Sequence, residues 1–420
     1  MLDYDLLTPS QLNTADEMFE RDHVHIIASM GSGKTVCALT AIDDMIFQQI
    51  GERYLVFAPL KVCQTVWPAE ARGWSHLGGL NVVHATGTPK QRKAIIEDVS
   101  NNVVCVNFEN IPWLVKEFPE LHKMFDGYVI DEVTKLKTVG GTSFKKFRKF
   151  VRYFKWRVTM SGTPVSENWT SLYAIMFLTD AGKALGRNKE KHLKKYFMAT
   201  DFQRRNWVLQ PTMDVALVRD IAHLIYVMPD YRAELPPLRE EKYWVEFDED
   251  ARERYREIAE EGILTLKEAD EDGEGGEEVG AQNAGVVVGK LQQLSQGFIY
   301  DDDKKVIRFN NDKICTLSAV MSEHIPSDEN VLIAYYFEAD LDELKILYPS
   351  AVVLNTAENI EAFKRGEVAI GLINPKSASH GLNLHTGAHH LIFYTLIWSN
   401  DAHKQTIARL WRRGQPHAVT

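Results

Sequence analysis

The segment Ala28–Thr35 reads Ala-Ser-Met-Gly-Ser-Gly-Lys-Thr and combines the residue types that bind phosphate. Gly31 and Gly33 carry no Cβ, so the backbone N–H groups around them can turn toward an anion. Lys34 would add a positive charge for the β- and γ-phosphates of a nucleoside triphosphate, and Thr35 would offer its hydroxyl to Mg²⁺. The residues expected to contact the triphosphate are consecutive: Met30, Gly31, Ser32, Gly33, Lys34 and Thr35. The pattern indicates triphosphate binding, but it leaves open what the binding drives.

Two adjacent carboxylates, Asp131 and Glu132, follow an apolar, strand-like run. Asp131 would bind Mg²⁺ directly or through water, and Glu132 would orient and deprotonate an attacking water molecule. On its own, such a pair could equally be a solvated strand end. Beside the loop at Ala28–Thr35, the pair favours a site that hydrolyses the triphosphate.

Three further signals each have two interpretations. The amide of Gln11 could both donate to and accept from adenine, or the residues around it could simply begin a helix. Arg409 and Arg412 should share one helix face and could neutralise phosphate charge, or they could form a solvated basic helix end. The small hydroxyls of Ser161–Pro164 could hydrogen-bond Glu132, or the segment could be a plain turn.

Apolar runs that alternate with helical patterns position these residues. Such alternation predicts an α/β fold with a parallel sheet covered by helices on both faces. Ligands of these sheets bind at the carboxyl ends of the strands, which is where Ala28–Thr35, Asp131 and Ser161 fall. The expected strands of this first region are Val24–Ala28, Tyr54–Ala58, Leu80–His84, Val103–Phe108, Tyr128–Asp131 and Arg157–Ser161.

A second region of strand–helix alternation follows a long, helical, charge-rich stretch that contains one strand-like run, Tyr243–Phe247. The expected strands of this second region are Val331–Tyr336, Ala351–Leu354, Val368–Ile373 and His390–Tyr394. The chain is therefore predicted to contain two α/β lobes, at residues 1–172 and 306–420. Helical protrusions and a linker would occupy residues 173–305 between them.

The segment 268–280 is expected to be a flexible acidic loop, because seven acids stand among glycines at residues 268–278. This loop accounts for much of the formal net charge of −10, so the overall charge does not exclude nucleic acid as a partner. Near the end of the chain, Pro416–Val419 has the pattern of a strand start, and the second lobe looks cut short at Thr420.

Composition argues against membrane and secreted classes, and the cysteines and histidines show none of the common zinc-motif spacings. No apolar run is long enough to span a membrane, and the acidic N-terminus, Met1–Asp5, lacks the apolar core of a signal peptide. The four cysteines show no paired spacing and predict buried thiols in a reducing compartment: Cys37, Cys63, Cys105 and Cys315. We expect a cytoplasmic protein that does not bind membranes.

The run Lys145–Arg157 interleaves basic and aromatic residues, a composition that also occurs in nucleic-acid-binding surfaces. Its apolar residues recur at helical spacing, which favours a buried core face over a base-stacking surface. The residues expected in that core are Phe144, Phe147, Phe150 or Val151, and Phe154.

Taken together and in this order, these segments resemble helicase superfamily 2, and within it the Swi/Snf-type DNA translocases. The resemblance covers nearly the whole chain. The short protrusions between the lobes resemble those of bacterial or phage-encoded members most. The further matching segments are Leu55–Lys61, Thr65–Glu70 with Trp74, Val106–Glu109, Ser161–Pro164 with Asn168 and Leu172, Leu291–Ser295, Gly381–Leu384, and Trp398, Gln405, Arg409, Arg412, Gly414 and Gln415.

The resemblance implies two RecA-like lobes that bind ATP and Mg²⁺ in the cleft between them. Gln11 would read adenine, and Arg409 and Arg412 would act from the second lobe as arginine fingers. Contacts to the DNA backbone would come from Lys61, Asn107 and Lys376. The implied function is a monomeric, DNA-stimulated ATP hydrolase that translocates on double-stranded DNA in a bacterial or phage-infected cell.

Two alternatives stay open. One is a helicase that separates the strands of DNA or RNA and holds single strands. The other is a nucleotide-gated clamp on nucleic acid with little hydrolysis. Departures from the family pattern motivate the clamp: Val133-Thr134 follow the acidic pair where the family usually has His or a similar group fourth, and Ala378-Ser379 stand where glycines are usual. The intact Lys34 and acidic pair argue against it.

Overall fold

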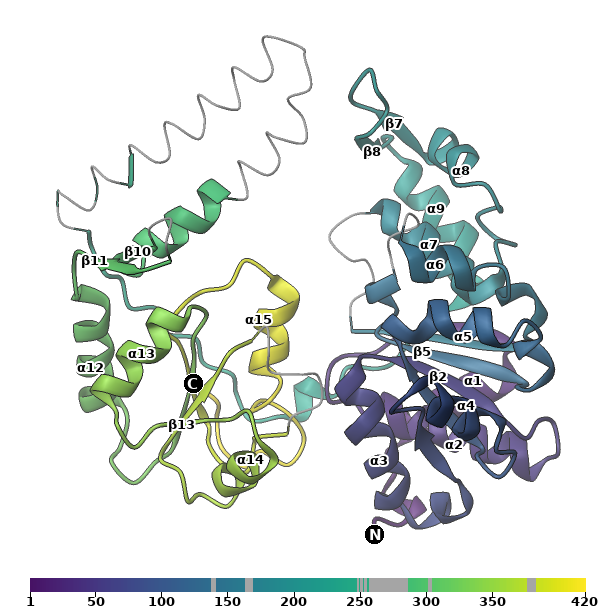
Figure 1. Cartoon of the computed structure of the whole chain (residues 1–420), viewed down its shortest axis with the longest axis horizontal. Coiled ribbons are helices and arrows are strands. Elements are labelled where there is room, and N and C mark those ends of the chain that lie inside the picture. Colours follow the sequence, from purple (N-terminus) through teal and green to yellow (C-terminus); the bar gives the residue numbers. More distant parts are fainter. Residues whose placement is uncertain are drawn as a thin grey trace. The chain divides into compact units, whose positions relative to one another are not determined.

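The computed structural model describes residues 1–136, 141–162, 169–247, 249, 252, 255–256, 286–300, 304–375 and 383–420. The chain divides into two compact units: the first covers Met1–Glu234, and the second covers Leu235–Ala378 with Leu382–Thr420. Figure 1 traces the elements of each unit. Several expected features lie outside the described residues: the acidic loop at 268–280, Thr163, Pro164, Asn168, Lys376, Ala378, Ser379, Gly381 and Leu382.

The first unit is built on a seven-stranded parallel sheet with the order β3-β4-β2-β5-β6-β1-β9. Six of these strands were expected from the sequence, each to within two residues at either end. The strand bounds are β1 (His23–Ile27), β2 (Tyr54–Ala58), β3 (Val82–His84), β4 (Val103–Asn107), β5 (Gly127–Asp131), β6 (Trp156–Ser161) and β9 (Ile225–Val227).

Helices cover both faces of this sheet, because successive strand residues point to opposite sides. On β2, Val56 and Ala58 join one apolar cluster, whereas Leu55 and Phe57 join another. The helices that pack in the first cluster are α1 (Pro9–Glu20), α2 (Lys34–Phe47) and α3 (Trp67–Gly73). Those that pack in the second are α4 (Pro89–Glu97), α5 (Ile111–Glu117), α6 (Thr142–Phe147), α7 (Leu172–Asp180) and α9 (Met213–Ile221). The predicted two-sided parallel sheet is confirmed.

The apolar residues that recur at helical spacing in and beside the basic run belong to the core, as that spacing predicted. Phe144, Phe147, Val151 and Phe154 are all buried in the second cluster. Burial of each such side chain stabilises the fold by about 1.5–3 kcal/mol. They are therefore not available to stack on bases.

The region between the predicted lobes is divided between the two units. The first unit includes α8 (Lys189–Tyr196) and an antiparallel hairpin of β7 (Phe197–Ala199) and β8 (Trp207–Leu209). It also includes β9, which pairs with β1, so this unit extends to Glu234 rather than ending at residue 172. The second unit includes a helix over residues 286–294 and the antiparallel pair β10 (Phe298–Tyr300) and β11 (Val306–Arg308).

The strand expected at Tyr243–Phe247 is wrong, because these residues form no strand. Tyr243, one of the apolar residues of the alternating pattern, is 43% exposed. Within the described residues, no sheet includes this segment. An alternating sequence becomes a strand only where a neighbouring strand completes its hydrogen bonds and covers its apolar side.

The second unit is built on a four-stranded parallel sheet with the order β13-β14-β12-β15. Its strands are β12 (Val331–Ala334), β13 (Val352–Val353), β14 (Ile370–Ile373) and β15 (His390–Phe393). On one face the sheet packs with α12 (Asp312–His324) and α13 (Glu338–Leu347), and on the other with α14 (Ala357–Lys364) and the segment after α15 (Asn400–Ile407). The four expected strands are confirmed with shorter bounds.

The last two residues extend this second sheet at the edge that β15 provides. The Thr420 N–H donates to the His389 carbonyl at 3.0 Å, and the Leu391 N–H donates to the Thr420 carbonyl at 2.8 Å. The terminal segment also pairs with a second stretch of chain: the Val419 N–H donates to the Pro237 carbonyl at 3.0 Å. The strand-like pattern that begins at Pro416 therefore corresponds to extended pairing around Val419 and Thr420.

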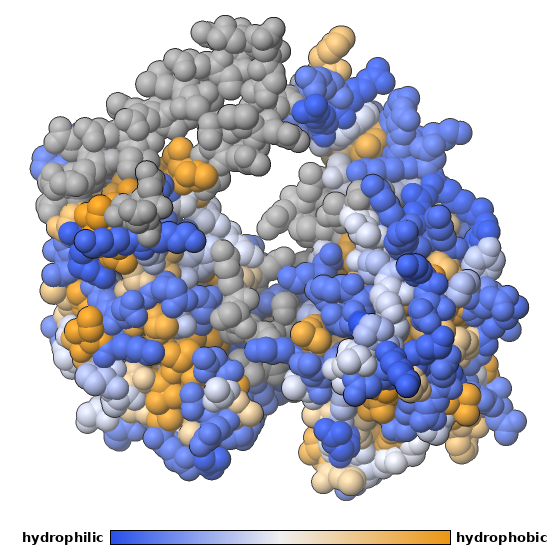
Figure 2. Space-filling view, viewed as in Figure 1, coloured by the Kyte–Doolittle hydropathy of each residue, from blue (hydrophilic) through white to orange (hydrophobic). Residues whose placement is uncertain are grey.

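The surface of each unit is mixed. On the face drawn in Figure 2, hydrophobic residues occur in small groups among hydrophilic ones. Among the described helices, none is long and apolar enough to cross a membrane. Three of the four cysteines, Cys37, Cys63 and Cys105, are buried thiols as expected, whereas Cys315 is exposed.

Candidate active site

The loop between β1 and α2 has the backbone conformation that its glycines permit. Gly31 and Gly33 adopt φ values of 77° and 86°, in the left-handed region that other residues rarely enter. Gly33 is the N-cap of α2. A Cβ at this position would lie 2.2 Å from the Gln11 Nε2 atom, so both conformation and space require glycine. The loop thereby brings its backbone next to the N-terminus of α2, and this arrangement favours binding of an anion.

Gln11 connects the start of α1 to this loop. Its Oε1 accepts from the Thr8 N–H at 2.9 Å, and its Nε2 donates to the Ser32 carbonyl at 3.1 Å. The side chain is 7% exposed. The sequence offered adenine contact and helix capping as two interpretations of Gln11, and the structure shows the helix cap together with a contact to the loop. Because Nε2 has a second N–H that could donate, adenine contact stays a prediction.

Asp131 ends β5 as a buried carboxylate, 6% exposed. The Trp67 Nε1–H donates to its Oδ2 at 3.2 Å. Burial raises the pKa of Asp131, and the nearby positive charge of Lys34 opposes that rise. The charges of Lys34 and Asp131 therefore influence one another, and a shared nucleotide site stays a prediction. The sequence did not assign Trp67 to this site.

Glu132 follows Asp131 in the left-handed region, with φ of 61°. This backbone conformation is uncommon for a residue with a Cβ and often marks functional sites. The Thr134 hydroxyl, in the short helix Val133–Leu136, donates to Glu132 Oε1 at 2.9 Å. Thr134, noted in the sequence only as a departure from the family pattern, thus holds the carboxylate beside it.

His25 on β1 joins the triphosphate loop strand to β6, and the sequence analysis did not predict it. Its Nδ1 lies 2.9 Å from Thr159 Oγ1, and its Nε2 lies 3.3 Å from Ser161 Oγ. Burial lowers the pKa of His25 to about 4, so the ring is neutral at pH 7. The Ala28 N–H also donates to the Ser161 carbonyl at 3.0 Å. The signal available in the sequence was a histidine within the apolar strand that precedes Ala28.

Contact with Glu132 was one of two interpretations of the Ser161 hydroxyl, and the structure places this hydroxyl 3.3 Å from His25 Nε2. Ser161 and Gly162 end β6 beside the loop, where a Cβ on Gly162 would lie 3.3 Å from the Met30 side chain. The Met30 carbonyl accepts from the Tyr231 hydroxyl at 2.7 Å. The end of β6 therefore packs against the triphosphate loop.

Arg409 and Arg412 were predicted on one helix face, and this prediction is wrong. α15 ends at Ile407, and both arginines lie in the turns that follow it. The chain leaves the helix because Leu410 is buried in the core and the Trp411 Nε1–H donates to the Pro236 carbonyl at 2.8 Å. These two contacts stabilise a chain that turns after Ile407 more than one that continues as a helix.

The two arginines differ in exposure. Arg409 is 4% exposed, whereas Arg412 is half-buried. Burial, with the neighbouring charge of Arg412, lowers the pKa of Arg409 to about 10, so the Arg409 side chain remains cationic at pH 7. Gln415 fixes the turn by donating to the His385 and Ala388 carbonyls, each at 3.0 Å.

The candidates for DNA contact have different settings. Lys61 is exposed just after β2. Asn107, at the end of β4, is 6% exposed and donates to Glu109 Oε2 at 2.6 Å, and it also accepts from Asn110. A phosphate contact through the Asn107 side chain would require those bonds to open. The third candidate, Lys376, lies outside the described residues.

Residues 20–291 match the SNF2-related domain family. The chain is 26% identical to protein p41 of Acyrthosiphon pisum secondary endosymbiont phage 1, an alignment that covers 98% of this chain and 89% of that protein. It is 22% identical to the CHD3-type chromatin-remodeling factor CHR7 of Arabidopsis thaliana, over 95% of this chain and 33% of that factor. The chain thus spans about a third of the plant relative.

The solved structure of the Pyrococcus furiosus Hef helicase domain is similar in fold, with a TM-score of 0.55 and 14% sequence identity. The alignment covers 97% of this chain and 93% of the Hef domain. Together with the two parallel sheets, each covered by helices, this similarity confirms the predicted α/β class. The chain belongs to the SNF2-related domain family, and its fold comprises two RecA-like lobes.

Proposed function

We propose that this chain is an ATP-dependent motor that hydrolyses ATP to ADP and phosphate and translocates on double-stranded DNA. The observation that carries the proposal is that Asp131, buried at the end of β5, lies close enough to Lys34 of the triphosphate loop for the lysine charge to oppose the rise in its pKa. A cation from the loop and a carboxylate from a nearby strand end are what a Mg²⁺–triphosphate site requires.

The loop fits a bound triphosphate. Gly31 and Gly33 hold the left-handed backbone that lets N–H groups face an anion. Ser32 Oγ is buried and has no hydrogen-bond partner among the described residues, so a phosphate oxygen would supply one. Lys34 and Thr35 would hold the phosphates and Mg²⁺. When bound, ATP supplies the phosphoryl group and Mg²⁺ supplies charge to offset that of the phosphates.

The carboxylates divide the remaining work. Asp131 binds Mg²⁺ in its ionised form, and the hydrogen bond from Trp67 favours that form against the cost of burial. Glu132 orients and deprotonates the attacking water, while the Thr134 hydroxyl restricts where its carboxylate can point. His25 keeps the end of β6 in register with the loop strand.

Arg409 and Arg412 of the second lobe complete the site in this proposal. They stabilise the negative charge of the transferring phosphoryl group when the lobes close on ATP. Arg412 is the better placed of the two to reach outward, because Arg409 is nearly fully buried. Turnover would then require both lobes, whereas nucleotide binding would require mainly the first.

Double-stranded DNA is the proposed track. The support is membership of the SNF2-related family and the similarity to a plant protein named as a chromatin-remodeling factor. Contacts through Lys61 and other basic groups to phosphates would give little sequence specificity and a steep salt dependence. The phage relative supports a bacterial or phage-infected cell as the setting, and we propose that the chain acts as a monomer.

Two assays test the proposal on the full chain. ATP hydrolysis should rise when duplex DNA is added, because the track completes the closure of the lobes. Displacement of a third strand from a triplex should occur, whereas a matched forked duplex should stay paired. Equal turnover with and without DNA would contradict the motor, and unwinding of the forked duplex would favour a helicase.

A further inference from the structure

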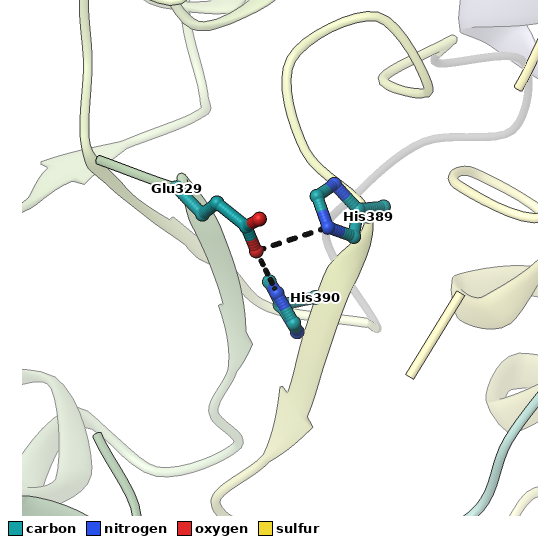
Figure 3. Close-up of side chains that lie close together, drawn as sticks. All are labelled: Glu329, His389 and His390. Carbon is teal, nitrogen blue, oxygen red and sulfur yellow. Dashed lines mark hydrogen bonds and ion pairs between the residues drawn. The ribbon is translucent and has the colours of Figure 1, made fainter. Parts of the chain in front are cut away.

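A cluster of two histidines and a glutamate lies in the second unit, apart from the residues assigned to ATP. Figure 3 shows Glu329, His389 and His390 turned toward one another. Glu329 precedes β12, and His390 is the first residue of β15. The two strands are parallel neighbours in which Val331 pairs with His390. The cluster therefore lies at the amino-terminal edge of the sheet, whereas ligands of such sheets bind at the opposite edge.

The three side chains converge on one carboxylate oxygen. Glu329 Oε2 lies 3.1 Å from His389 Nε2 and 2.5 Å from His390 Nε2. One ligand atom from each residue can be chosen so that all three lie within 4.8 Å of one another. The side chains of Glu329, His389 and His390 are 35%, 20% and 12% exposed, so the cluster is partly shielded yet reachable from solvent.

The chemistry of the three side chains suits a cation. A carboxylate and a neutral imidazole are the forms that bind metal ions.

The position of the His390 ring depends on the contact that its Nε2 makes. Its Nδ1 is buried and has no hydrogen-bond partner in the described part of the chain. The ring of His417 lies 4.8 Å from that of His389 between centroids, so another imidazole stands next to the cluster. Two imidazole nitrogens and one carboxylate form a ligand set that zinc enzymes use, with water in the fourth position.

We propose that Glu329, His389 and His390 bind one Zn²⁺ ion with a fourth position open to water. Imidazole ligands select zinc-like transition metals over Mg²⁺, so this site would not compete for the metal that serves ATP. The ion would join the segment before β12 to the start of β15, where Thr420 also bonds His389. Its role would be to stabilise the second lobe, and it does not depend on the proposed motor activity.

The test uses the full chain after treatment with a chelator. Titration with zinc chloride, followed by calorimetry and elemental analysis, should show one Zn²⁺ per chain and a higher unfolding temperature. Substitution with Co²⁺ should give the visible absorption of a tetrahedral site. Glu329→Gln and His389→Ala should each weaken zinc binding at least roughly tenfold.

The matched control is His324→Ala, because His324 also faces a glutamate, Glu323, at 4.0 Å but has no second histidine in that pair. It should bind zinc like the unmodified chain. Circular dichroism of the zinc-free variants checks that they fold, and Glu329→Gln changes the shape of the side chain least. No zinc binding by the unmodified chain, equal binding by Glu329→Gln and His389→Ala, or displacement of the zinc by millimolar Mg²⁺ would each overturn the proposal.

Discussion

The two lobes use the same architecture to present charge in different ways. In the first lobe, residues at the ends of parallel strands are held by buried neighbours: Asp131 by Trp67, and Ser161 by His25. In the second lobe, Arg409 and Arg412 lie in turns after α15, not at strand ends. In our proposal the first lobe therefore offers a preformed anion site, whereas the second would supply cations from a segment that a few anchoring contacts position.

This difference predicts that nucleotide binding depends mainly on the first lobe, whereas turnover depends on both lobes. Variants of the triphosphate loop should therefore lose affinity and rate together, and variants of the second-lobe arginines should lose rate alone. Four substitutions probe how each lobe holds its charged groups, and they are ordered below by the size of the expected effect.

Lys34→Ala should abolish ATP hydrolysis and weaken ATP binding, because the loop loses the charge that balances the phosphates. The measurement is phosphate release together with binding of a fluorescent ATP analogue. Lys116→Ala, at an exposed position on α5, is the control and should keep both properties. Unchanged turnover in Lys34→Ala would refute the assignment of the triphosphate loop.

Arg412→Ala should lower the maximal hydrolysis rate by about 10³ while ATP affinity stays nearly constant, as for other arginine fingers. Single-turnover kinetics and equilibrium binding separate the two quantities. Arg413→Ala changes the adjacent cation and should cost much less turnover. A parallel loss of affinity and rate in Arg412→Ala would end the proposed division between the lobes.

His25 should make the first lobe acid-sensitive. Its pKa is about 4 in the folded chain and about 6.5 when unfolded, so the unfolded state binds the extra proton between these values. Stability is therefore lost as pH falls from about 6.5 to 4, by roughly 3 kcal/mol in total.

In His25→Gln that acid-induced loss should largely disappear, which urea unfolding of the first lobe at pH 7 and pH 5 can measure. His223→Gln, at an exposed position, should keep the profile of the unmodified chain. Identical pH profiles for His25→Gln and the unmodified chain would show that His25 is not the buried neutral link described above.

Trp67→Phe should reduce turnover by roughly tenfold at pH 7, because it removes a hydrogen bond to a charged group. Without that bond the pKa of Asp131 rises further, so less carboxylate is ionised and Mg²⁺ binds more weakly. Raising the pH should recover activity in this variant. Trp74→Phe loses a comparable bond, to Glu70, outside the site and should not show this pH dependence.

Local patterns predicted the sheet and the loop well. Strands such as Tyr54–Ala58 and the left-handed glycines Gly31 and Gly33 depend on short-range sequence, because period-2 apolar runs and missing Cβ atoms act locally. Tyr243–Phe247 shows where local patterns fail, because a strand needs a partner that its own sequence cannot supply.

The sequence by itself determined the family, the two-lobe α/β class and the identity of the charged groups, since these rest on residue types and spacing. Only the tertiary structure decided which neighbouring residues contact the functional groups. Trp67 reaches Asp131 from 64 positions away, and His25 reaches Ser161 from 136. The tertiary structure also ended α15 before Arg409 and Arg412, and it placed Glu329 next to His389 and His390. Such contacts depend on which strands become neighbours, and that choice is made by the packing of the whole core.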